Sequence, residues 1–293
     1  MVKINYTIII PHKNSTELLQ RCLNSIPRRC DIQIIVVDDN SDSDKIDFTQ
    51  FPCLNDPSVE IIFSKEGKGA GFARNTGLAK ACGKWILFAD ADDYFTGDFL
   101  EHLDKYIDSD YDLIYFGIYH QKIKNQEPYI FAHKNSDRLM REAINEQKYD
   151  EYKYRSYVPW GKIIKLALIK EHNILFDETR AANDKMFSLK TAYYAKNIHF
   201  DAGRIYIYVR GFSLITKNKS PQANFDRFYV YVRMNRFFED ISRQKYQTKL
   251  LPPLIKLFNI KNPGLFLSGL KVLKENNFNI YCEILKCFYR RKI

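Results

Sequence analysis

Two short apolar runs in this chain each end directly in a cluster of acidic residues, and this pattern constrains the fold more than any other. Residues 32–37 are aliphatic except for Gln33 and lead into residues 38–41 (DDNS), and residues 85–88 lead into residues 89–93 (ADADD). Short runs rich in β-branched or aromatic side chains predict buried strands. In an open α/β sheet, ligands bind beyond the carboxyl ends of the strands. We therefore expect both acidic clusters at one edge of one sheet.

The second cluster crowds three carboxylates, Asp90, Asp92 and Asp93, into four residues. Such groups repel one another unless a cation joins them. Mg²⁺ and Mn²⁺ prefer carboxylate and phosphate oxygens, so a metal that carries a phosphate is one explanation. A solvated acidic turn that closes a strand is the other, because aspartates are common in turns. The presence of two clusters at one edge favours the metal.

The first hundred residues alternate between strand and helix patterns. Strands are predicted at 6–10, 32–37, 60–64 and 84–89, and helices at 15–26, 70–81 and 97–107. Such alternation is typical of βαβ units in a mixed, mostly parallel sheet flanked by helices.

The remainder of the chain gives a less regular pattern. We expect a strand at 112–119, irregular or helical structure over 120–155, helices at 162–172 and 184–195, and a late strand at 205–209. Ser220-Pro221 predicts a boundary before a helix over 225–244, and Pro252-Pro253 predicts a further break.

The order of the motifs resembles that of family 2 glycosyltransferases with the Rossmann-like GT-A fold. The resemblance rests on residues 7–11 (TIIIP), 36–41 (VVDDNS), 69–77 (GAGFARNTG), 90–93 (DADD, with its Asp-x-Asp pattern), 160–162 (WGK), 174–178 (ILFDE) and 183–187 (NDKMF). It implies an α/β catalytic domain over 1–216, with a nucleotide-sugar half at about 1–110 and an acceptor half at about 111–216. Residues 217–293 would form a helical, basic C-terminal appendage.

The same resemblance implies where a UDP-sugar would bind. Pro11 would lie at the nucleotide rim and Asp39 would hydrogen-bond the uracil ring. Arg74 would point toward the nucleotide, Asp90 would contact the ribose, and Asp92 would coordinate Mn²⁺ or Mg²⁺.

Four further residues are weaker candidates for the site. The resemblance implies that Asp184 is the general base, although Asn183 stands where the family pattern has a second acid, and the local pattern alone fits Asp184 as a helix N-cap. Trp160 and Lys162 are candidate sugar or acceptor contacts, and a buried tryptophan is an equally good explanation of Trp160. Asp93 either assists the metal site or closes a turn.

Together these expectations describe an inverting, metal-dependent hexosyltransferase. It would move a sugar from a UDP-sugar to a glycan or lipid-linked acceptor in capsule, O-antigen or lipooligosaccharide synthesis. The sequence leaves the sugar, acceptor and linkage open, and UDP-galactose, UDP-glucose and UDP-N-acetylhexosamines all fit.

Two other function classes compete with this hypothesis. A dinucleotide-binding oxidoreductase would use the glycines of residues 67–71 and an acid about twenty residues on, but Phe72 and Arg74 stand where its last glycine is required. A non-catalytic membrane- or nucleic-acid-binding protein would use the basic C-terminus. No helix-turn-helix, RNP-type or zinc signature supports the nucleic-acid version, and we expect no nucleic-acid partner.

The net charge of +10 is concentrated near the C-terminus. Residues 252–293 hold eight lysines and arginines against two glutamates. Apolar residues recur beside these cations at helical intervals, namely Leu254, Leu257, Phe258, Tyr281, Ile284, Leu285 and Phe288. An apolar stripe flanked by cations is typical of a helix that docks on anionic membrane. Packing on the catalytic domain or on a second subunit remains the alternative.

The remaining composition points to the cytoplasm. Six cysteines show neither zinc-type nor Cys-x-x-Cys spacing, which favours reduced thiols. We recognise neither a signal peptide nor an apolar stretch long enough to span a bilayer. The expected location is cytoplasmic, with peripheral attachment to the inner face of the membrane left open.

Overall fold

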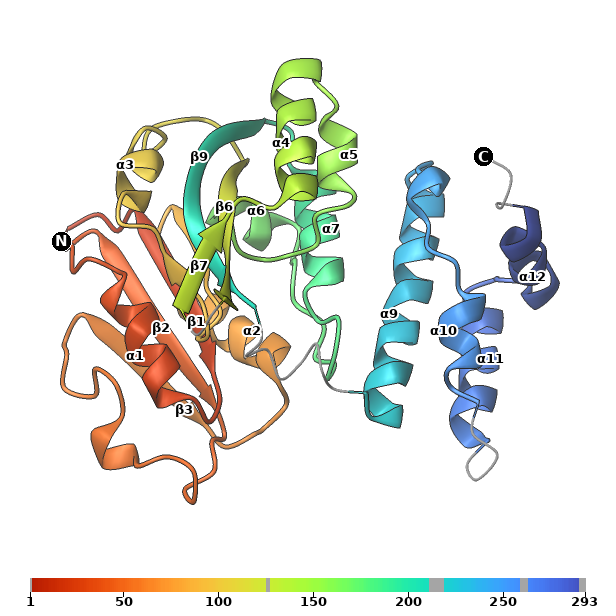
Figure 1. Ribbon diagram of the computed structural model, residues 1–293, viewed down its shortest axis with the longest axis horizontal. Helices are drawn as coiled ribbons and strands as arrows, with labels where there is room; N and C mark the ends of the chain where they lie inside the picture. The colour runs from red at the N-terminus through yellow and green to blue at the C-terminus, as the bar shows by residue number, and fades with distance from the viewer. Residues whose placement is uncertain (1, 125–126, 211–218, 259–262, 290–293) are drawn as a thin grey trace.

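The computed structural model describes residues 2–124, 127–210, 219–258 and 263–289 (Figure 1). Its strands form one mixed sheet in the order β3-β2-β1-β4-β8-β6-β9-β5, with β7 paired to β6. Helices cover both faces of the sheet, and further helices follow it toward the C-terminus (Figure 1). The α/β fold with a helical C-terminal region agrees with the sequence prediction.

The N-terminal half is the parallel part of the sheet. It contains β1 (Tyr6–His12), β2 (Ile32–Asp39), β3 (Val59–Ser64) and β4 (Trp85–Phe88), with α1 (Thr16–Asn24), η1 (Phe48–Gln50), α2 (Ala70–Lys80) and α3 (Phe99–Asp104). Tyr6 on β1 pairs with Ile32 on one side and with Trp85 on the other. This register brings the carboxyl ends of β2 and β4 to either side of the end of β1. The expectation that both acidic clusters lie at one sheet edge is therefore confirmed.

The second half mixes parallel and antiparallel pairs. It contains β5 (Tyr94–Phe95), β6 (Leu113–Lys124), β7 (Glu127–Phe131), α4 (Lys134–Glu146), α5 (Tyr149–Lys153), β8 (Lys162–Lys165), α6 (Leu166–Glu171), α7 (Lys185–Tyr194) and β9 (Ile198–Val209). β6 runs parallel to β9, and β8 lies antiparallel between β4 and β6.

Two predictions for this half are wrong in part. The helix predicted over 162–172 begins only at Leu166, because the first four residues form β8 and pair with both β4 and β6. Pairing on two sides overrides the weak local preference of so short a run. The segment 120–155, expected to be irregular or helical, begins with a β6–β7 hairpin before α4 and α5.

The core lies on both faces of the sheet. One face packs against α1 and α3 through Leu19, Leu23, Phe99 and Leu103. The other packs against α2 and α4–α7 through Leu78, Met140, Tyr152, Ile169 and Phe187. Burial of each such side chain contributes about 1.5–3 kcal/mol to the free energy of unfolding. The packed core therefore keeps the strand ends and their polar residues in fixed positions.

The C-terminal helices are α9 (Pro221–Asp240), α10 (Leu251–Ile255), α11 (Gly264–Glu275) and α12 (Ile280–Tyr289), with η2 (Gln244–Tyr246) between α9 and α10. The break predicted at Ser220-Pro221 coincides with the start of α9, where the Ser220 hydroxyl accepts from the Ala223 amide and caps the helix. A domain boundary at this point stays a prediction. The break predicted at Pro252-Pro253 lies just before these prolines, because α10 begins at Leu251 after a non-helical stretch. These prolines lie in the first turn of α10, where a missing N–H costs little. The predicted boundary between residues 216 and 217 falls outside the described residues.

These helices carry their own apolar core, and α9 lies between α7 and the rest (Figure 1). Leu254 and Leu257 of the predicted apolar stripe are buried with Phe228. Phe258, Tyr281 and Leu285 are exposed, and the side chains of Ile284 and Phe288 lie outside the described residues. None of the helices described is long and apolar enough to cross a membrane.

Candidate functional site

A cavity of about 900 Å³ opens at the carboxyl ends of β1, β2 and β4. All five residues predicted to hold the nucleotide sugar line it, namely Pro11, Asp39, Arg74, Asp90 and Asp92. The four weaker candidates, Asp93, Trp160, Lys162 and Asp184, are not part of this lining.

Asp39 lies at one end of the cavity and is almost completely buried. The Gly69 amide donates to Asp39 Oδ2 at 2.9 Å, and Lys13 Nζ lies 3.5 Å from the same oxygen. Gly69 has a φ of +95°, a left-handed conformation that favours glycine and that turns its N–H toward the carboxylate. Asp39 Oδ1 has no hydrogen-bond partner among the described residues. A buried carboxylate oxygen in this state is ready to accept from a ligand N–H.

The neighbouring Asp38 is used inside the protein instead. It accepts from His12 Nδ1 at 2.8 Å and from both the amide and the hydroxyl of Ser41. Burial raises the pKa of Asp38, but these hydrogen bonds outweigh burial and lower it overall. The Ser15 amide donates to His12 Nε2, so the His12 proton lies on Nδ1. Sequence reasoning missed this network because nothing in the motif spacing reveals it.

Arg74 links the helix α2 to the end of β4. Its Nη2 donates to Asp90 Oδ1 at 2.5 Å, and its Nη1 donates to Asn183 Oδ1 at 3.0 Å. The guanidinium lies over the Phe176 ring and is buried. Asn183, which departs from the family pattern, thus holds the arginine that contacts Asp90. No local pattern indicates this contact, because the two residues are 109 positions apart.

The carboxylates of Asp90, Asp92 and Asp93 each offer an oxygen within 4.8 Å of the others. Burial and the Asp90 charge raise the pKa of Asp92 to about 6 and that of Asp93 well above its usual value. Asp93 accepts from the Tyr206 hydroxyl and from the Val209 amide, so β9 fixes it. No described side chain donates a hydrogen bond to the Asp92 carboxylate. A cation would relieve the repulsion, and this donor set fits hard Mg²⁺ or Mn²⁺.

Asp184 occupies the N-cap position of α7, but its side chain makes no capping hydrogen bond. The prediction of a capping side chain is therefore wrong, while the role of a base remains a prediction. Burial raises the pKa of this carboxyl, and the charges of Lys185 and Arg74 oppose the rise. A carboxylate with a raised pKa is a stronger proton acceptor, as a general base requires.

Lys162 and Trp160 lie in the interior. Lys162 is 2% exposed, donates to Ser188 Oγ at 3.3 Å, and faces the Tyr115 ring. Burial lowers its pKa to about 7, against the opposing charge of Asp184. Trp160 stacks on Tyr206 and Tyr208, with both pairs of ring centroids 5.3 Å apart. This arrangement agrees with the alternative that Trp160 is a core residue.

The far wall of the cavity was not foreseen. Residues 178–180 and the first two turns of α9 line it, through Glu178, Arg180, Gln222 and Asp226. Asp226 accepts from the Arg180 amide at 2.9 Å and from Gln222 at 3.0 Å. The C-terminal region therefore contributes to the cavity, although the sequence pattern presented it as a separate appendage.

Comparison with known proteins identifies a family. Residues 7–172 match Glycosyl transferase family 2. The chain is 28% identical over 209 residues to the uncharacterized glycosyltransferase EpsJ of Bacillus subtilis. The matched segment covers 69% of this chain and 60% of EpsJ. The chain is also 28% identical over 209 residues to the poly(ribitol-phosphate) beta-glucosyltransferase of Bacillus spizizenii, covering 69% of this chain and 32% of that protein. The chain thus spans less than two thirds of either relative.

A crystal structure of S. aureus TarS, residues 1–349, in complex with UDP-GlcNAc has a similar fold. The two structures superpose with a TM-score of 0.66 at 19% identity, over 91% of this chain and 80% of that one. At this identity the likeness concerns the fold, which is the GT-A type expected from the sequence.

Proposed function

This chain belongs to glycosyl transferase family 2, and on that premise we propose that it moves a sugar from a metal-bound UDP-sugar to an acceptor hydroxyl. The observation that carries the proposal is a single cavity with two complementary ends. One end holds the buried, unpaired Asp39 Oδ1, and the other holds the crowded carboxylates Asp90 and Asp92. A nucleoside diphosphate has matching groups in the same order, an N–H at the base and anionic phosphates.

Each end would bind a different part of the donor. Asp39 Oδ1 would accept from the uracil N–H, while Gly69 keeps the carboxylate in place. Asp90, fixed by Arg74, would contact the ribose. Asp92 with Asp90 would hold Mn²⁺ or Mg²⁺, which neutralises the charge of the diphosphate leaving group when bound.

The transfer step would be a single displacement with inversion. The acceptor oxygen forms a bond to the anomeric carbon as the bond from that carbon to the phosphate oxygen breaks. Asp184 takes the proton of the acceptor hydroxyl, and UDP leaves with the electron pair of the broken bond. The adjacent Asn183 lines the cavity, which supports placing the base near the reacting atoms.

The acceptor would be a glycan or lipid-linked sugar of the bacterial surface, such as capsule, O-antigen or lipooligosaccharide. Relatives named for transfer to poly(ribitol-phosphate) support a surface polymer. In this proposal the catalytic domain comprises residues 1–216, with the acceptor bound by the half that follows residue 110. Residues 217–293 form the C-terminal region.

The C-terminal helices would also attach the enzyme to anionic membrane. Large apolar side chains are exposed on these helices at Ile255, Leu267, Tyr281 and Leu285, and just after α10 at Phe258. The exposed Lys256 and Lys274 accompany these residues. Apolar side chains beside cations support binding at an acidic lipid surface.

Calorimetry with UDP tests the donor site directly. UDP should bind in the presence of Mn²⁺, EDTA should weaken the binding, and NAD should not compete. No binding of UDP would contradict the proposal. Binding of NAD as tight as that of UDP would also contradict it and would favour the oxidoreductase alternative. With an α-configured UDP-sugar, NMR of the product should show a β linkage, and an α linkage would contradict inversion.

A further inference from the structure

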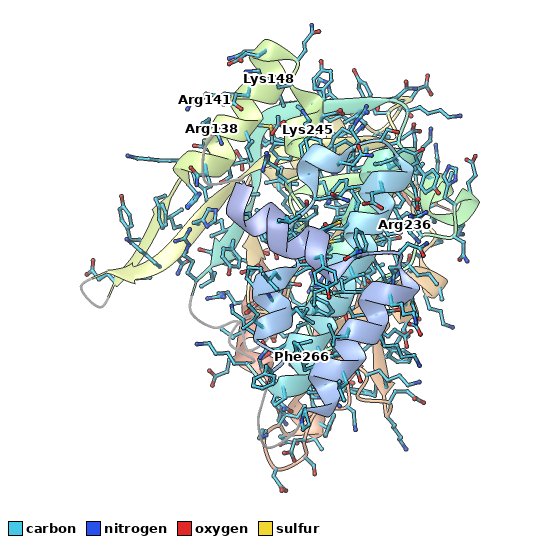
Figure 2. All side chains as sticks on the ribbon, turned by 90° about the vertical axis from the view of Figure 1, so that its right-hand side faces the viewer. Arg138, Arg141, Lys148, Arg236, Lys245 and Phe266 are labelled. Carbon is cyan, nitrogen blue, oxygen red and sulfur yellow. The ribbon has the colours of Figure 1, made fainter. Side chains whose placement is uncertain are left out.

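The end of β6 and the strand β7 form a hairpin that stands out from the body of the molecule (Figure 2). In its register Lys122 lies opposite Tyr129, and His120 lies opposite Phe131. Residues directly opposite one another share a face of the hairpin. We call these four residues, together with the adjoining Arg210, the hairpin face.

The hairpin face combines aromatic rings with cations. The Tyr129 and Phe131 rings are stacked, with centroids 5.6 Å apart and planes inclined by 15°. Lys122 Nζ lies 5.8 Å from the Tyr129 centroid and 5.3 Å from that of Phe131, and Arg210 Cζ lies 5.4 Å from Phe131. Tyr129 is 46% exposed. Rings of this kind offer a stacking surface for the C–H face of a sugar.

One buried polar atom of this face lacks a partner. His120 is 8% exposed, and its Nδ1 accepts from Arg210 Nε at 3.3 Å. The proton of the neutral ring therefore lies on Nε2, which has no acceptor among the described residues. A buried donor without an acceptor is costly, so a ligand oxygen at this point would be favourable.

The cations of the face are not neutralised by neighbouring acids. Among the described residues, neither Lys122 nor Arg210 forms an ion pair with a carboxylate. The carboxylate that lies near His120 is Asp137, and it pairs with Arg204 at 3.0 Å. Burial together with the charges of Arg210 and His133 lowers the pKa of His120 to about 4, which agrees with an excess of positive charge. An anionic ligand would complement this surface.

The hairpin face is also tied to the acid cluster. The Val209 amide donates to Asp93 Oδ1 at 2.7 Å, and Arg210 is the next residue. On the other side, the Tyr94 hydroxyl donates to Gln121 Oε1 at 2.5 Å, and Tyr94 directly follows Asp93. These two bonds connect the base of the hairpin with the end of the donor cavity where the sugar would be transferred.

We propose that the hairpin face binds a phosphorylated sugar unit of the acceptor. The sugar ring stacks on Tyr129 and Phe131, His120 Nε2 donates to one of its oxygens, and Lys122 and Arg210 hold the phosphate. Guanidinium and ammonium groups bind phosphate through charge-assisted hydrogen bonds. The assignment of this ligand to the acceptor rests on the proposed glycosyl transfer.

Saturation-transfer NMR with glucose 6-phosphate tests the proposal, with glucose and inorganic phosphate measured alongside. The enzyme is first saturated with UDP and Mg²⁺, so that the donor cavity is filled. Glucose 6-phosphate should bind about tenfold more tightly than glucose or inorganic phosphate. The double variant Lys122→Ala/Arg210→Ala should reduce its affinity to that of glucose. Tyr129→Ala should weaken glucose and glucose 6-phosphate alike.

The matched control is Ile130→Ala, because Ile130 lies on the opposite face of the hairpin and is 45% exposed. It should leave the binding of all three probes unchanged, and thermal unfolding verifies that every variant folds. Equal affinity for glucose and glucose 6-phosphate, or no effect of the double variant, would overturn the proposal. UDP binding is measured separately by calorimetry, so a failure of the donor site is distinguishable from a failure of the hairpin face.

Discussion

The backbone N–H of Gly69 donates to Asp39 Oδ2 at 2.9 Å, while Asp39 Oδ1 has no partner among the described residues. One oxygen of the carboxylate is thus held by the protein and the other is not, and Asp39 is one of the residues that line the cavity. The adjacent Asp38 has both oxygens occupied by His12 and Ser41. Of two neighbouring aspartates in one motif, the structure therefore leaves only Asp39 able to accept from a ligand.

Replacing Asp39 by alanine should weaken UDP binding and leave metal binding to the free enzyme almost unchanged. The lost hydrogen bond to a ring N–H should cost about 1–3 kcal/mol, or roughly tenfold to a hundredfold in Kd. Calorimetry with UDP measures the change. The exposed Asp44→Ala is the control and should bind UDP normally. An unchanged Kd for Asp39→Ala would mean that another group recognises the base.

Much of the N-terminal half could be predicted because β1, β2 and β4 are buried apolar runs and α1 has the apolar spacing of a helix, so both signals are local. The register of β1 with β2 and β4 then brings Asp39 and Asp92 to one edge, as the strand ends implied. Contacts between distant segments had no such local signal. Asn183 reaches Arg74 across 109 residues, and Asp226 joins the cavity from a helix that the sequence pattern set apart.

The second half was harder to predict for a physical reason. β8 is only four residues long and is a strand because β4 and β6 bond to it on both sides. The β6–β7 hairpin carries exposed charges and aromatic rings, so it lacks the buried apolar alternation that marks a strand. In both cases the tertiary partners decide the structure, and a local pattern cannot reveal them.

Asp92→Asn should abolish metal-dependent transfer in a well-folded protein. No described side chain donates to this carboxylate, so the substitution breaks no observed hydrogen bond within the fold. Loss of a charged metal ligand should cost several kcal/mol of transition-state stabilisation, or roughly a thousandfold in kcat. Rates at several Mn²⁺ concentrations measure the effect. Turnover close to that of the wild type would exclude Asp92 as the ligand.

Asp93→Asn is a useful contrast, because Asp93 is fully buried and accepts from Tyr206 and Val209. This variant should lower the free energy of unfolding, whereas Asp92→Asn should not. Thermal unfolding of both proteins separates the two roles.

Asp184→Asn should spare UDP binding and remove transfer. The amide is nearly the same size as the carboxylate, and no capping hydrogen bond is lost because the Asp184 side chain makes none. The amide cannot accept the acceptor's proton, which should reduce kcat by about 10²–10⁴-fold. Calorimetry reads donor affinity and a product assay reads transfer. If both decline together, or neither changes, the base is a different residue.

Lys162→Met should flatten the rise of stability with pH. Burial lowers the pKa of Lys162 from 10.5 to about 7 in the folded protein. Between pH 7 and pH 10.5 the Lys162 side chain is protonated in the unfolded chain but not in the folded protein. The free energy of unfolding therefore increases with pH, by up to about 1.4 kcal/mol per pH unit. Urea unfolding at pH 7.5 and pH 9.5 should show a smaller rise for Lys162→Met than for the wild type. The exposed Lys170→Met is the control, and equal slopes for all three proteins would show that Lys162 keeps its charge.

The C-terminal helices should bind anionic vesicles through their exposed apolar residues. Deleting the whole region would confuse the test, because Leu254 and Leu257 cover Phe228 of α9. The better variant is Phe258→Ser/Leu267→Ser, since these side chains are 58% and 60% exposed and their loss should not disturb the core. Burying them in lipid should contribute about 1.5–3 kcal/mol each, with the exposed lysines adding a salt-dependent attraction.

Sedimentation with phosphatidylglycerol vesicles at low salt measures this binding, and neutral phosphatidylcholine vesicles test the role of charge. The wild-type protein should sediment with the anionic vesicles only, and the double variant should remain in solution. Leu54→Ser, at a 40% exposed apolar residue of the N-terminal half, is the matched control and should sediment like the wild type. If the double variant also sediments, or the wild type does not, these apolar side chains serve another contact, such as one with a second copy of the chain. Analytical ultracentrifugation of the same proteins would detect that association directly.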